Sequence, residues 1–182
     1  MMTRIAWGIT GSGDYLEETL EVMIEISEKH DDVEIVPVLS KNGELVLKWY
    51  KFYDKLGKHF PNIKIEKGPN IPFIAGPLQT GAYKFMVVCP ATGNTTAKIA
   101  HGIADSLITN AVAQAMKGNI PIYIYPVDQR VGSVTTDLPD GRKFTLTMRK
   151  VDKDNVDKLR RMDGITVLSR PREIMDVIQE YL

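Results

Sequence analysis

The chain alternates short apolar segments with longer segments of helical periodicity along almost its whole length. Five apolar segments have the composition of buried strands, and they lie at Arg4–Ile9, Val33–Ser40, Tyr83–Cys89, Ile120–Pro126 and Ile165–Ser169. Their apolar residues follow one another instead of alternating with polar ones, which is typical of strands covered on both faces of a parallel sheet. The alternation therefore predicts an α/β fold in three layers, with a mostly parallel sheet between two layers of helices.

Helical segments with one apolar face are predicted between these strands. They lie at Asp14–His30, Gly43–Gly57, Thr95–Gly118, Asp152–Met162 and Pro171–Leu182. A break is expected within the third of them, near Gly102–Asp105, and the chain before it holds a weak strand at Ile63–Glu66 and an irregular segment at Gly68–Gly81. Because 182 residues suffice for one core and are too few for two ordinary ones, a single domain over residues 1–182 is expected.

One segment departs from the alternation. The turn sequence Pro139-Asp140-Gly141 lies between two arms rich in strand-forming residues. Such an arrangement favours a β-hairpin. We therefore expect a hairpin flap near residues 131–151, outside the central sheet.

Composition excludes several classes of function. Lys+Arg and Asp+Glu number 23 each, so the formal net charge is zero and a nucleic acid is not expected as a partner. Cys89 is the only cysteine, and the three histidines are scattered, so no disulfide, iron–sulfur cluster or other metal site built by one chain is expected. No segment approaches the roughly 20 apolar residues of a membrane span, and no signal peptide is recognisable, so a cytoplasmic protein without a membrane partner is expected.

Small and hydroxyl side chains follow three of the predicted strands, at Thr10–Gly13 (TGSG), Ser40–Gly43 and Pro90–Thr95 (PATGNT). Ligands of open parallel sheets bind beyond the carboxyl ends of the strands. Glycine allows close approach of a backbone, and a helix N-terminus offers N–H donors, so these loops suit a phosphate group. An alternative is that the first loop is an ordinary turn and that Ser40 only caps a helix.

The same loops resemble a known family. PATGNT at Pro90–Thr95 resembles the PASANT motif of the homo-oligomeric flavin-containing cysteine decarboxylase superfamily, and GIADSL at Gly102–Leu107 resembles the G-[IM]-A-[DN]-x-L pattern of its next helix. GITGSG at Gly8–Gly13 is similar to its first loop, and Ser40 falls where it often has a serine. The resemblance covers about residues 3–126 and implies a Rossmann-like domain that binds FMN.

The resemblance also implies where the FMN lies. Its phosphate is expected at the first loop and Ser40, and its ring near the PATGNT loop, often at an interface between subunits. The implied cofactor-binding residues are Thr10, Gly11, Ser12, Gly13, Ser40, Pro90, Ala91, Thr92, Asn94 and Thr95.

Within the superfamily the chain is most similar to the archaeal flavoprotein branch, where GPLQ-G-x-Y-x-F precedes the fourth strand and PATxNTxAKIAxGIADxLxTNA follows it. Here Gly76–Phe85 contains no histidine, whereas the decarboxylases have one in that place, and Pro126–Gln129 differs from their Pro-x-Met-Asn clamp. The prenyl-FMN synthases are a second comparison, for which Arg130 alone is a candidate phosphate ligand.

The archaeal branch implies an FMN-dependent oxidoreductase or electron carrier. Its members resemble FMN carriers reduced by a ferredoxin, and the related dihydromethanopterin reductases pass electrons to a pterin. A ferredoxin-like donor, a small acceptor such as a dihydropterin, and a homo-oligomer built on trimers are therefore expected. The alternatives are a flavin-dependent lyase of the cysteine decarboxylase type and a non-catalytic flavin-binding module.

Other notable residues have structural interpretations. Cys89 ends a buried strand and is interpreted as a small core residue, and Asp105 as a loop or cap residue. Trp49, Phe52 and Tyr53 are expected to pack a helix onto the sheet, although one of them could flank a flavin. The lysines of that segment form a solvated face that could also attract an acidic donor; they are Lys48, Lys51, Lys55 and Lys58. No catalytic residue is assigned.

Overall fold

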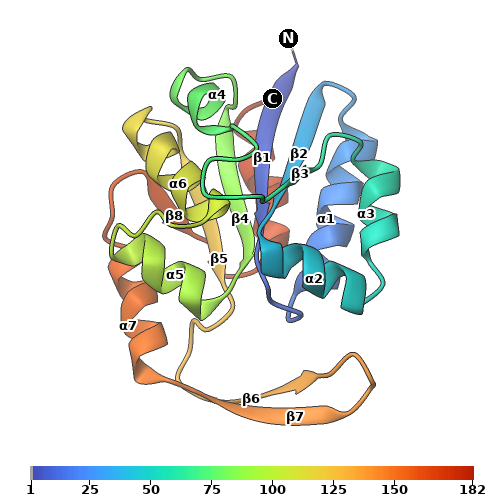
Figure 1. Ribbon diagram of the computed structural model, residues 1–182, viewed down its shortest axis with the longest axis vertical. Coiled ribbons are helices and arrows are strands. Elements are labelled where there is room, and N and C mark those ends of the chain that lie inside the picture. The colour runs from blue at the N-terminus through green and yellow to red at the C-terminus, as the bar shows by residue number, and fades with distance from the viewer. Residues whose placement is uncertain (1) are drawn as a thin grey trace.

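The computed structural model describes residues 2–182 and has a six-stranded sheet at its centre (Figure 1). The strands of this sheet are β1 (Thr3–Ile9), β2 (Val33–Leu39), β3 (Lys64–Ile65), β4 (Phe85–Ala91), β5 (Ile122–Pro126) and β8 (Ile165–Val167). Their order is β3-β2-β1-β4-β5-β8, and every neighbouring pair is parallel. The predicted α/β fold with a parallel sheet is confirmed.

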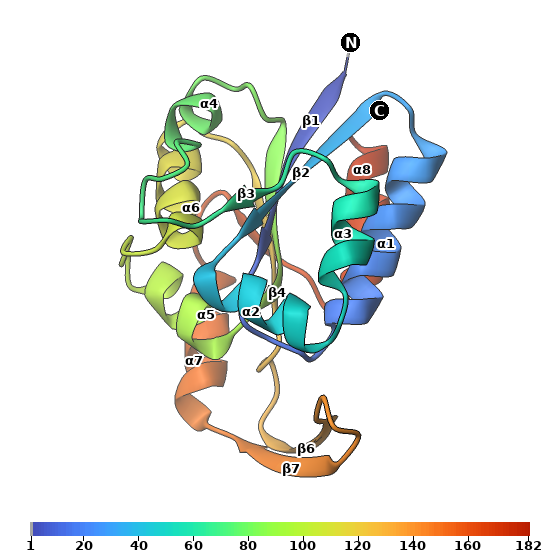
Figure 2. The ribbon, with the colours of Figure 1, turned by 45° about the vertical axis from the view of Figure 1, so that its right-hand side comes forward.

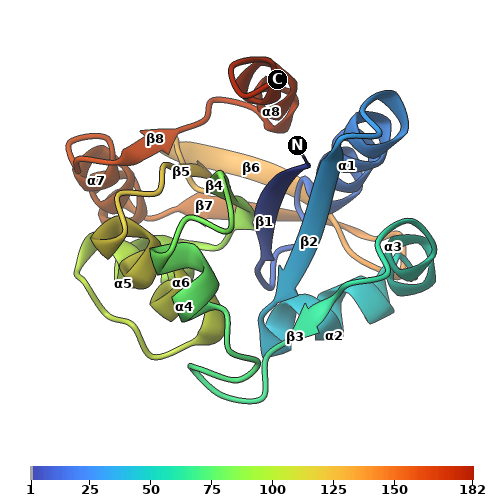
Figure 3. The same ribbon diagram turned by 90° about the horizontal axis from the view of Figure 1, so that it is seen from above.

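Helices cover both faces of the sheet, as Figure 2 and Figure 3 show. One face packs against α1 (Leu16–Lys29), α3 (Tyr53–His59) and α8 (Ile174–Gln179), which follows a single 3₁₀ turn at Pro171–Glu173. The other face packs against α4 (Ala75–Gln79), α5 (Gly93–Ala100), α6 (Leu107–Lys117) and α7 (Lys150–Leu159). The remaining helix, α2 (Lys41–Trp49), begins where β2 ends.

Alternate residues of each buried strand enter opposite cores, as the pleat of a strand requires. In β1, Trp7 belongs to the core on the α1 face, whereas Ala6 belongs to the core on the α6 face. Trp7 is fully buried, its indole N–H donates to the Cys89 carbonyl at 2.8 Å, and its ring meets Phe60 edge-on at 5.6 Å. Because Cys89 lies in β4, Trp7 joins the two central strands as well as filling the core.

The predicted helix at Gly43–Gly57 is wrong, because the chain forms two helices there. α2 ends at Trp49, Lys51 takes a left-handed φ of 61°, and α3 begins at Tyr53. The Phe52 N–H donates to the Leu47 carbonyl at 2.9 Å and closes the end of α2. No glycine or proline marks this break, so the helical pattern seemed continuous.

The break also moves one aromatic side chain away from its predicted place. Trp49 has 59% of its surface exposed, so its expected packing against the sheet is wrong. Phe52 and Tyr53 are half-buried against the core, as expected. The break predicted near Gly102–Asp105 is confirmed between α5 and α6, whereas the short α4 lies in a segment predicted to be irregular.

The predicted hairpin flap is confirmed. β6 (Gly132–Asp137) and β7 (Lys143–Met148) form a separate antiparallel pair, which crosses the end of the molecule at which the sheet strands finish (Figure 1). Two side-chain hydrogen bonds join it to the body. The Tyr50 hydroxyl donates to the Asp137 carbonyl at 3.1 Å, and the Thr136 hydroxyl donates to the Asp14 carboxylate. Among residues 2–182, no helix combines the length and the apolar character that crossing a membrane requires.

The two tryptophans provide a matched test of the packing. Replacing Trp7 by Phe removes buried ring volume and leaves the Cys89 carbonyl without its donor, so we expect Trp7→Phe to lower the free energy of unfolding by about 2 kcal/mol. Trp49→Phe should change it by less than about 0.5 kcal/mol, because that side chain is mostly exposed. Urea unfolding followed by circular dichroism at one protein concentration measures both, and equal losses would contradict the assigned core.

Candidate functional site

A crevice forms where the order of the strands reverses. β1 and β4 are neighbours, but the chain continues from β1 to β2 and β3 on one side and from β4 to β5 and β8 on the other. The loops that follow β1 and β4 therefore separate, and open parallel sheets bind ligands at such a point. The loops Thr10–Gly13 and Pro90–Thr95 both lie there.

The two loops are joined by the side chain of Thr10. Its hydroxyl donates to the Pro90 carbonyl at 2.7 Å and accepts from the Thr92 N–H at 2.9 Å. Thr10 is 1% exposed, so both hydrogen bonds are shielded from water. Because its hydroxyl donates to one residue of the PATGNT loop and accepts from another, Thr10 holds the two loops in place.

A cavity of about 370 Å³ opens beside this junction. It is lined by Gly11, Ser40, Lys41, Asn42, Glu66, Thr92, Asn94, Thr95, Lys98 and Ser106. The cavity thus brings together five of the predicted binding residues from three separate loops. Its volume lies in the range of ordinary small-molecule sites.

The backbone of the first loop lies close to Asn42, and its N–H groups have no hydrogen-bond partner within residues 2–182. A Cβ on Gly11 would lie 2.6 Å from the Cβ of Asn42, so only glycine fits there. None of the hydrogen bonds found within residues 2–182 uses the backbone N–H of Gly11, Ser12 or Gly13. Successive free N–H groups of this kind form a concave site for an anion.

Three helices also begin at the cavity, and each has a side-chain cap. Ser40 accepts from the Gly43 N–H at 2.9 Å at the start of α2, and Thr92 accepts from the Thr95 N–H at 3.2 Å at the start of α5. Ser106 and Thr109 form a reciprocal capping box at the start of α6. The positive ends of three helix dipoles therefore meet at one place, which favours a negatively charged group.

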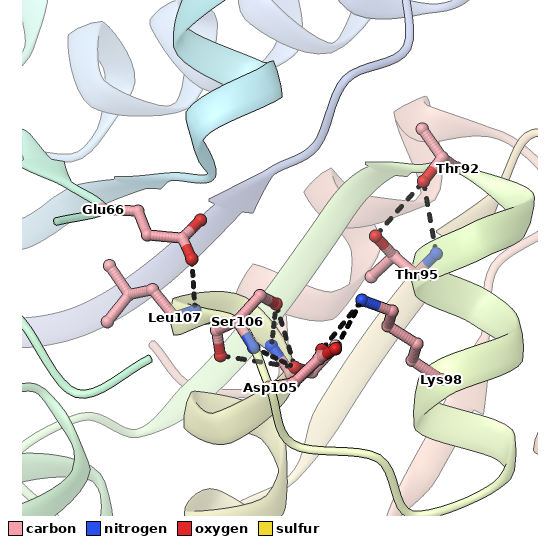
Figure 4. Close-up of polar contacts among 8 residues, drawn as sticks. Glu66, Thr92, Thr95, Lys98, Asp105, Ser106 and Leu107 are labelled. Atoms are coloured by element: carbon pink, nitrogen blue, oxygen red, sulfur yellow. Dashed lines mark hydrogen bonds and ion pairs between the residues drawn. The ribbon is translucent and has the colours of Figure 1, made fainter. Parts of the chain in front are cut away.

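One carboxylate already lies among these helix ends (Figure 4). Glu66 accepts from the Lys41 N–H at 3.0 Å and from the Leu107 N–H at 3.2 Å, so it bridges the first turns of α2 and α6. On the opposite wall, Lys98 forms an ion pair with Asp105 at 2.8 Å. Asp105 thus has the structural role expected of it, and Lys98 is held at the rim of the cavity.

Several lining residues were not predicted from the sequence. Ser106 could have been found, because Ser106-x-x-Thr109 is a cap-like pattern directly before an apolar helix. Glu66 follows a two-residue strand and contacts residues 25 and 41 positions away, so no local pattern marks it.

Other predicted residues lie behind the cavity or beside it. Pro90 and Ala91 are buried in β4, and Ser12 is 7% exposed with its hydroxyl donating to the Asp14 carbonyl at 3.4 Å. Gly13 lines a different cavity, beneath the hairpin. Cys89 is fully buried, and burial raises the pKa of its thiol to about 12, so it is the inert core residue that was expected.

A pair of carboxyl groups supports the start of α5. Asp128 and Asp152 approach Gly93 so closely that a Cβ there would lie 2.7 Å from one and 3.0 Å from the other. Burial raises the pKa of Asp128, and the charge of Asp152 raises it further. Arg149 offsets part of this charge through two hydrogen bonds to Asp152, at 2.8 and 2.7 Å.

The residues that line the cavity include no histidine. His101 faces Asn155 at 3.1 Å, and His59 faces Glu28 at 3.8 Å, both away from the lining residues. In the part of the chain from residue 2 to 182, no group of three or more His, Cys, Asp and Glu side chains is arranged to hold a metal ion.

Comparison with known proteins gives concordant matches over the whole chain. Residues 2–180 match the family model for flavoproteins. An uncharacterised protein of Methanocaldococcus jannaschii is 52% identical over 182 residues, which cover 100% of this chain and 97% of that protein. The dihydromethanopterin reductase (acceptor) of the same organism is 31% identical over 95% of this chain and 94% of its own length.

Solved structures of flavoproteins share the fold of this chain. Burkholderia xenovorans DmrB in complex with FMN, described as a cubic protein cage for redox transfer, is 32% identical with a TM-score of 0.84, over 99% of this chain and 95% of that one. The peptidyl-cysteine decarboxylase EpiD shares the fold, with a TM-score of 0.62 at 19% identity over 93% of this chain and 87% of its own. The resemblance to the flavin-containing cysteine decarboxylase superfamily is thereby confirmed at the level of the fold.

The junction at Thr10 can be tested directly. Thr10→Val keeps the shape of the side chain but leaves the Thr92 N–H without an acceptor, so we expect unfolding to become easier by about 1–3 kcal/mol. Thr10→Ser retains the hydroxyl and should lose less. Hydrogen exchange at the Thr92 amide should accelerate in the valine variant alone, and unchanged exchange there would show that the bond does not hold the loops together.

Proposed function

The chain belongs to the flavoprotein family, and from this premise we propose that it binds FMN at the β1–β4 crevice and passes electrons from a protein donor to a small acceptor. The observation that carries the proposal is the free N–H row of Gly11, Ser12 and Gly13 beside a cavity at which three helices begin. The FMN complex of DmrB, which is similar along its whole length, supports the choice of cofactor.

Each part of the cavity has a role toward the cofactor. The backbone of Gly11–Gly13 binds the phosphate, and the Asn42 N–H in the first turn of α2, which no hydrogen bond within residues 2–182 uses, adds a further donor. Asn94 is exposed at the start of α5 and donates to the edge of the ring, while Thr92 and Thr95 fix that turn by their mutual hydrogen bond at 3.2 Å. When bound, FMN supplies one- and two-electron transfer, which the lining side chains cannot perform themselves.

The electron donor is proposed to be an acidic protein of the ferredoxin type. Lys51, Lys55 and Lys58 are exposed on and beside α3, and complementary charge favours association with such a partner. The acceptor is proposed to be a dihydropterin, because a dihydromethanopterin reductase is 31% identical to the chain along almost its whole length.

A homo-oligomer built on trimers is proposed as the working assembly. Trp49 and Phe73 are exposed by 59% and 64%, and Ile71 and Ile103 by 57% and 48%. Large apolar side chains that remain exposed in one chain are often covered in an assembly. The cage described for DmrB supports the same assignment.

The two rival functions differ from this proposal in the reaction that each would catalyse, if any. A cysteine decarboxylase-type lyase would release carbon dioxide from a cysteinyl compound, and the cavity offers it no histidine. A flavin-binding module would bind FMN without turnover. Measuring carbon dioxide release and acceptor reduction on one preparation separates the three.

Cofactor binding is expected to depend on Gly11. In Gly11→Ala the added methyl group displaces Asn42 and narrows the cavity, so the Kd of FMN should rise about tenfold or more, equivalent to at least about 1.4 kcal/mol. Gly57→Ala is the matched control, since nothing lies within 4 Å of a Cβ there. Titration of apoprotein by quenching of FMN fluorescence measures both, and an unchanged Kd in Gly11→Ala would place the cofactor elsewhere.

The bound flavin is expected to accept electrons from a ferredoxin and to pass them on to a dihydropterin. In anaerobic stopped-flow absorbance, a reduced low-potential ferredoxin should bleach the flavin band of the loaded protein, and added dihydropterin should restore it. High salt should slow the first step, because lysine-assisted docking is screened. Bound FMN that no ferredoxin reduces would refute the carrier function, and reduction without reoxidation by dihydropterin would refute the acceptor.

A further inference from the structure

We propose that Lys98 raises the reduction potential of the bound flavin by holding a fixed positive charge beside its ring, and that Asp105 limits the effect of that charge. Lys98 is the one charged residue that α5 contributes to the lining of the cavity at the β1–β4 crevice, within residues 2–182. The inference rests on the proposed function, because it concerns the site at which FMN is proposed to bind. It goes beyond cofactor binding, since it concerns how readily the bound cofactor accepts electrons.

Lys98 lies on the wall of the cavity to which the ring is assigned. Asn94 and Lys98 are four residues apart on α5, so they lie one turn apart on one face of the helix, with Cβ atoms about 5–6 Å apart. Both line the cavity, together with Thr92 and Thr95. A ligand edge that Asn94 contacts is therefore within reach of the longer Lys98 side chain as well.

The Lys98 ammonium group is held in place by Asp105, which belongs to the connection between α5 and α6 (Figure 4). Its Nζ lies 2.8 Å from both carboxylate oxygens, Oδ1 and Oδ2. The Lys98 carbonyl also accepts from the Ile103 N–H at 2.8 Å, so backbone and side chain are joined to the same connection. Since the Lys98 side chain is only 27% exposed, its charge is fixed and partly shielded from water.

The ammonium group keeps a hydrogen-bond donor for a ligand. A lysine has three N–H donors, and the two contacts with Asp105 use at most two of them. Within residues 2–182, Nζ of Lys98 forms no other hydrogen bond or ion pair. At least one N–H is therefore available to an acceptor in the cavity, such as a carbonyl oxygen of a flavin ring.

The other charged residues that line the cavity are placed differently. The Glu66 carboxylate accepts from the Lys41 and Leu107 N–H groups and so lies between α2 and α6. The Lys41 side chain is exposed to solvent. Neither residue belongs to α5, so neither charge lies on the wall assigned to the ring.

A fixed cation on this wall favours the reduced ring over the oxidised one. Two electrons from the donor protein and one proton from solvent add one negative charge to a flavin ring, and charge near the ring nitrogens is a means by which proteins tune a flavin. Lys98 attracts the added charge more strongly in a partly shielded cavity than in bulk water, and Asp105 opposes part of this attraction. Lys98 therefore tightens the binding of reduced FMN relative to oxidised FMN, and this difference raises the reduction potential.

The reduction potential of the FMN-loaded protein, measured by anaerobic titration against a dye of known potential, tests this role. In Lys98→Gln, the ratio of the Kd of oxidised FMN to the Kd of reduced FMN should fall about tenfold or more, which corresponds to a potential lower by about 30 mV for two electrons. Lys98→Arg keeps the positive charge and should stay close to the unsubstituted protein. Asp105→Asn removes the opposing charge and should raise the potential.

Sulfite binding provides a second measurement that needs no electron donor. Sulfite gives an electron pair to N5 of the oxidised ring, so one N–S bond forms, the ring gains a negative charge and the visible flavin band is lost. We expect the Kd of sulfite to rise about tenfold or more in Lys98→Gln and to fall in Asp105→Asn. A purely structural ion pair would weaken binding in both variants, so opposite changes identify an effect of charge.

Lys150 and Asp154 form the matched control pair. Their side chains are 2.7 Å apart on α7, neither lines the cavity, and Asp154 is exposed by 53%, close to the 54% of Asp105. Lys150→Gln and Asp154→Asn should therefore change neither the potential nor the affinity for sulfite.

The outcomes separate this inference from the proposed function. Absence of bound FMN in the unsubstituted protein would refute the proposed function itself. If FMN binds but Lys98→Gln and Asp105→Asn leave the potential unchanged or shift it in the same direction, the role of Lys98 is wrong while the FMN site stands. Equal weakening of oxidised and reduced FMN in Lys98→Gln would place Lys98 at the phosphate and overturn the inference. If Lys98→Gln binds no FMN, the potentials of Lys98→Arg and Asp105→Asn decide.

Discussion

The site depends first on the opposite directions that the chain takes after β1 and after β4. It depends equally on the Thr10 hydroxyl, which joins the ends of these two strands. These strands are neighbours, but the segments after them leave toward opposite edges of the sheet. A crevice is therefore unavoidable, and Thr10 closes its floor by hydrogen bonds to Pro90 and Thr92. Because one buried side chain holds the loops together, the residues around the crevice can stay small, which leaves room for a ligand.

The charges around the crevice favour one orientation of a bound ligand. Three helices begin around the cavity, and their positive ends would repel one another without a negative charge between them. Glu66 supplies that charge for α2 and α6 through the Lys41 and Leu107 N–H groups. The free N–H groups of Gly11–Gly13 are left uncompensated on the other side. An anionic group is therefore directed toward the first loop and away from Glu66.

The sequence was informative wherever the determinants are local, and uninformative where distant segments meet. Buried strands and glycine loops show in short windows, so the sheet and most of the cavity loops were predictable. The bridge made by Glu66 was not, because its partners come from two other segments of the chain. The exposure of Trp49 was missed because the turn at Lys51 contains no glycine or proline to interrupt the pattern. The cavity beneath the hairpin depends on how a separate element folds back onto the body, which no periodicity in the sequence encodes.

The first loop separates two cavities. Gly11 faces Asn42 on the side of the cavity proposed to bind FMN, and a Cβ on Gly13 would lie 2.4 Å from the Tyr50 hydroxyl on the side of the cavity beneath the hairpin. A side chain at either position would thicken this loop or displace one of its supports. The TGSG sequence is thus explained by demands from both sides at once, beyond the flexibility that a turn alone would need.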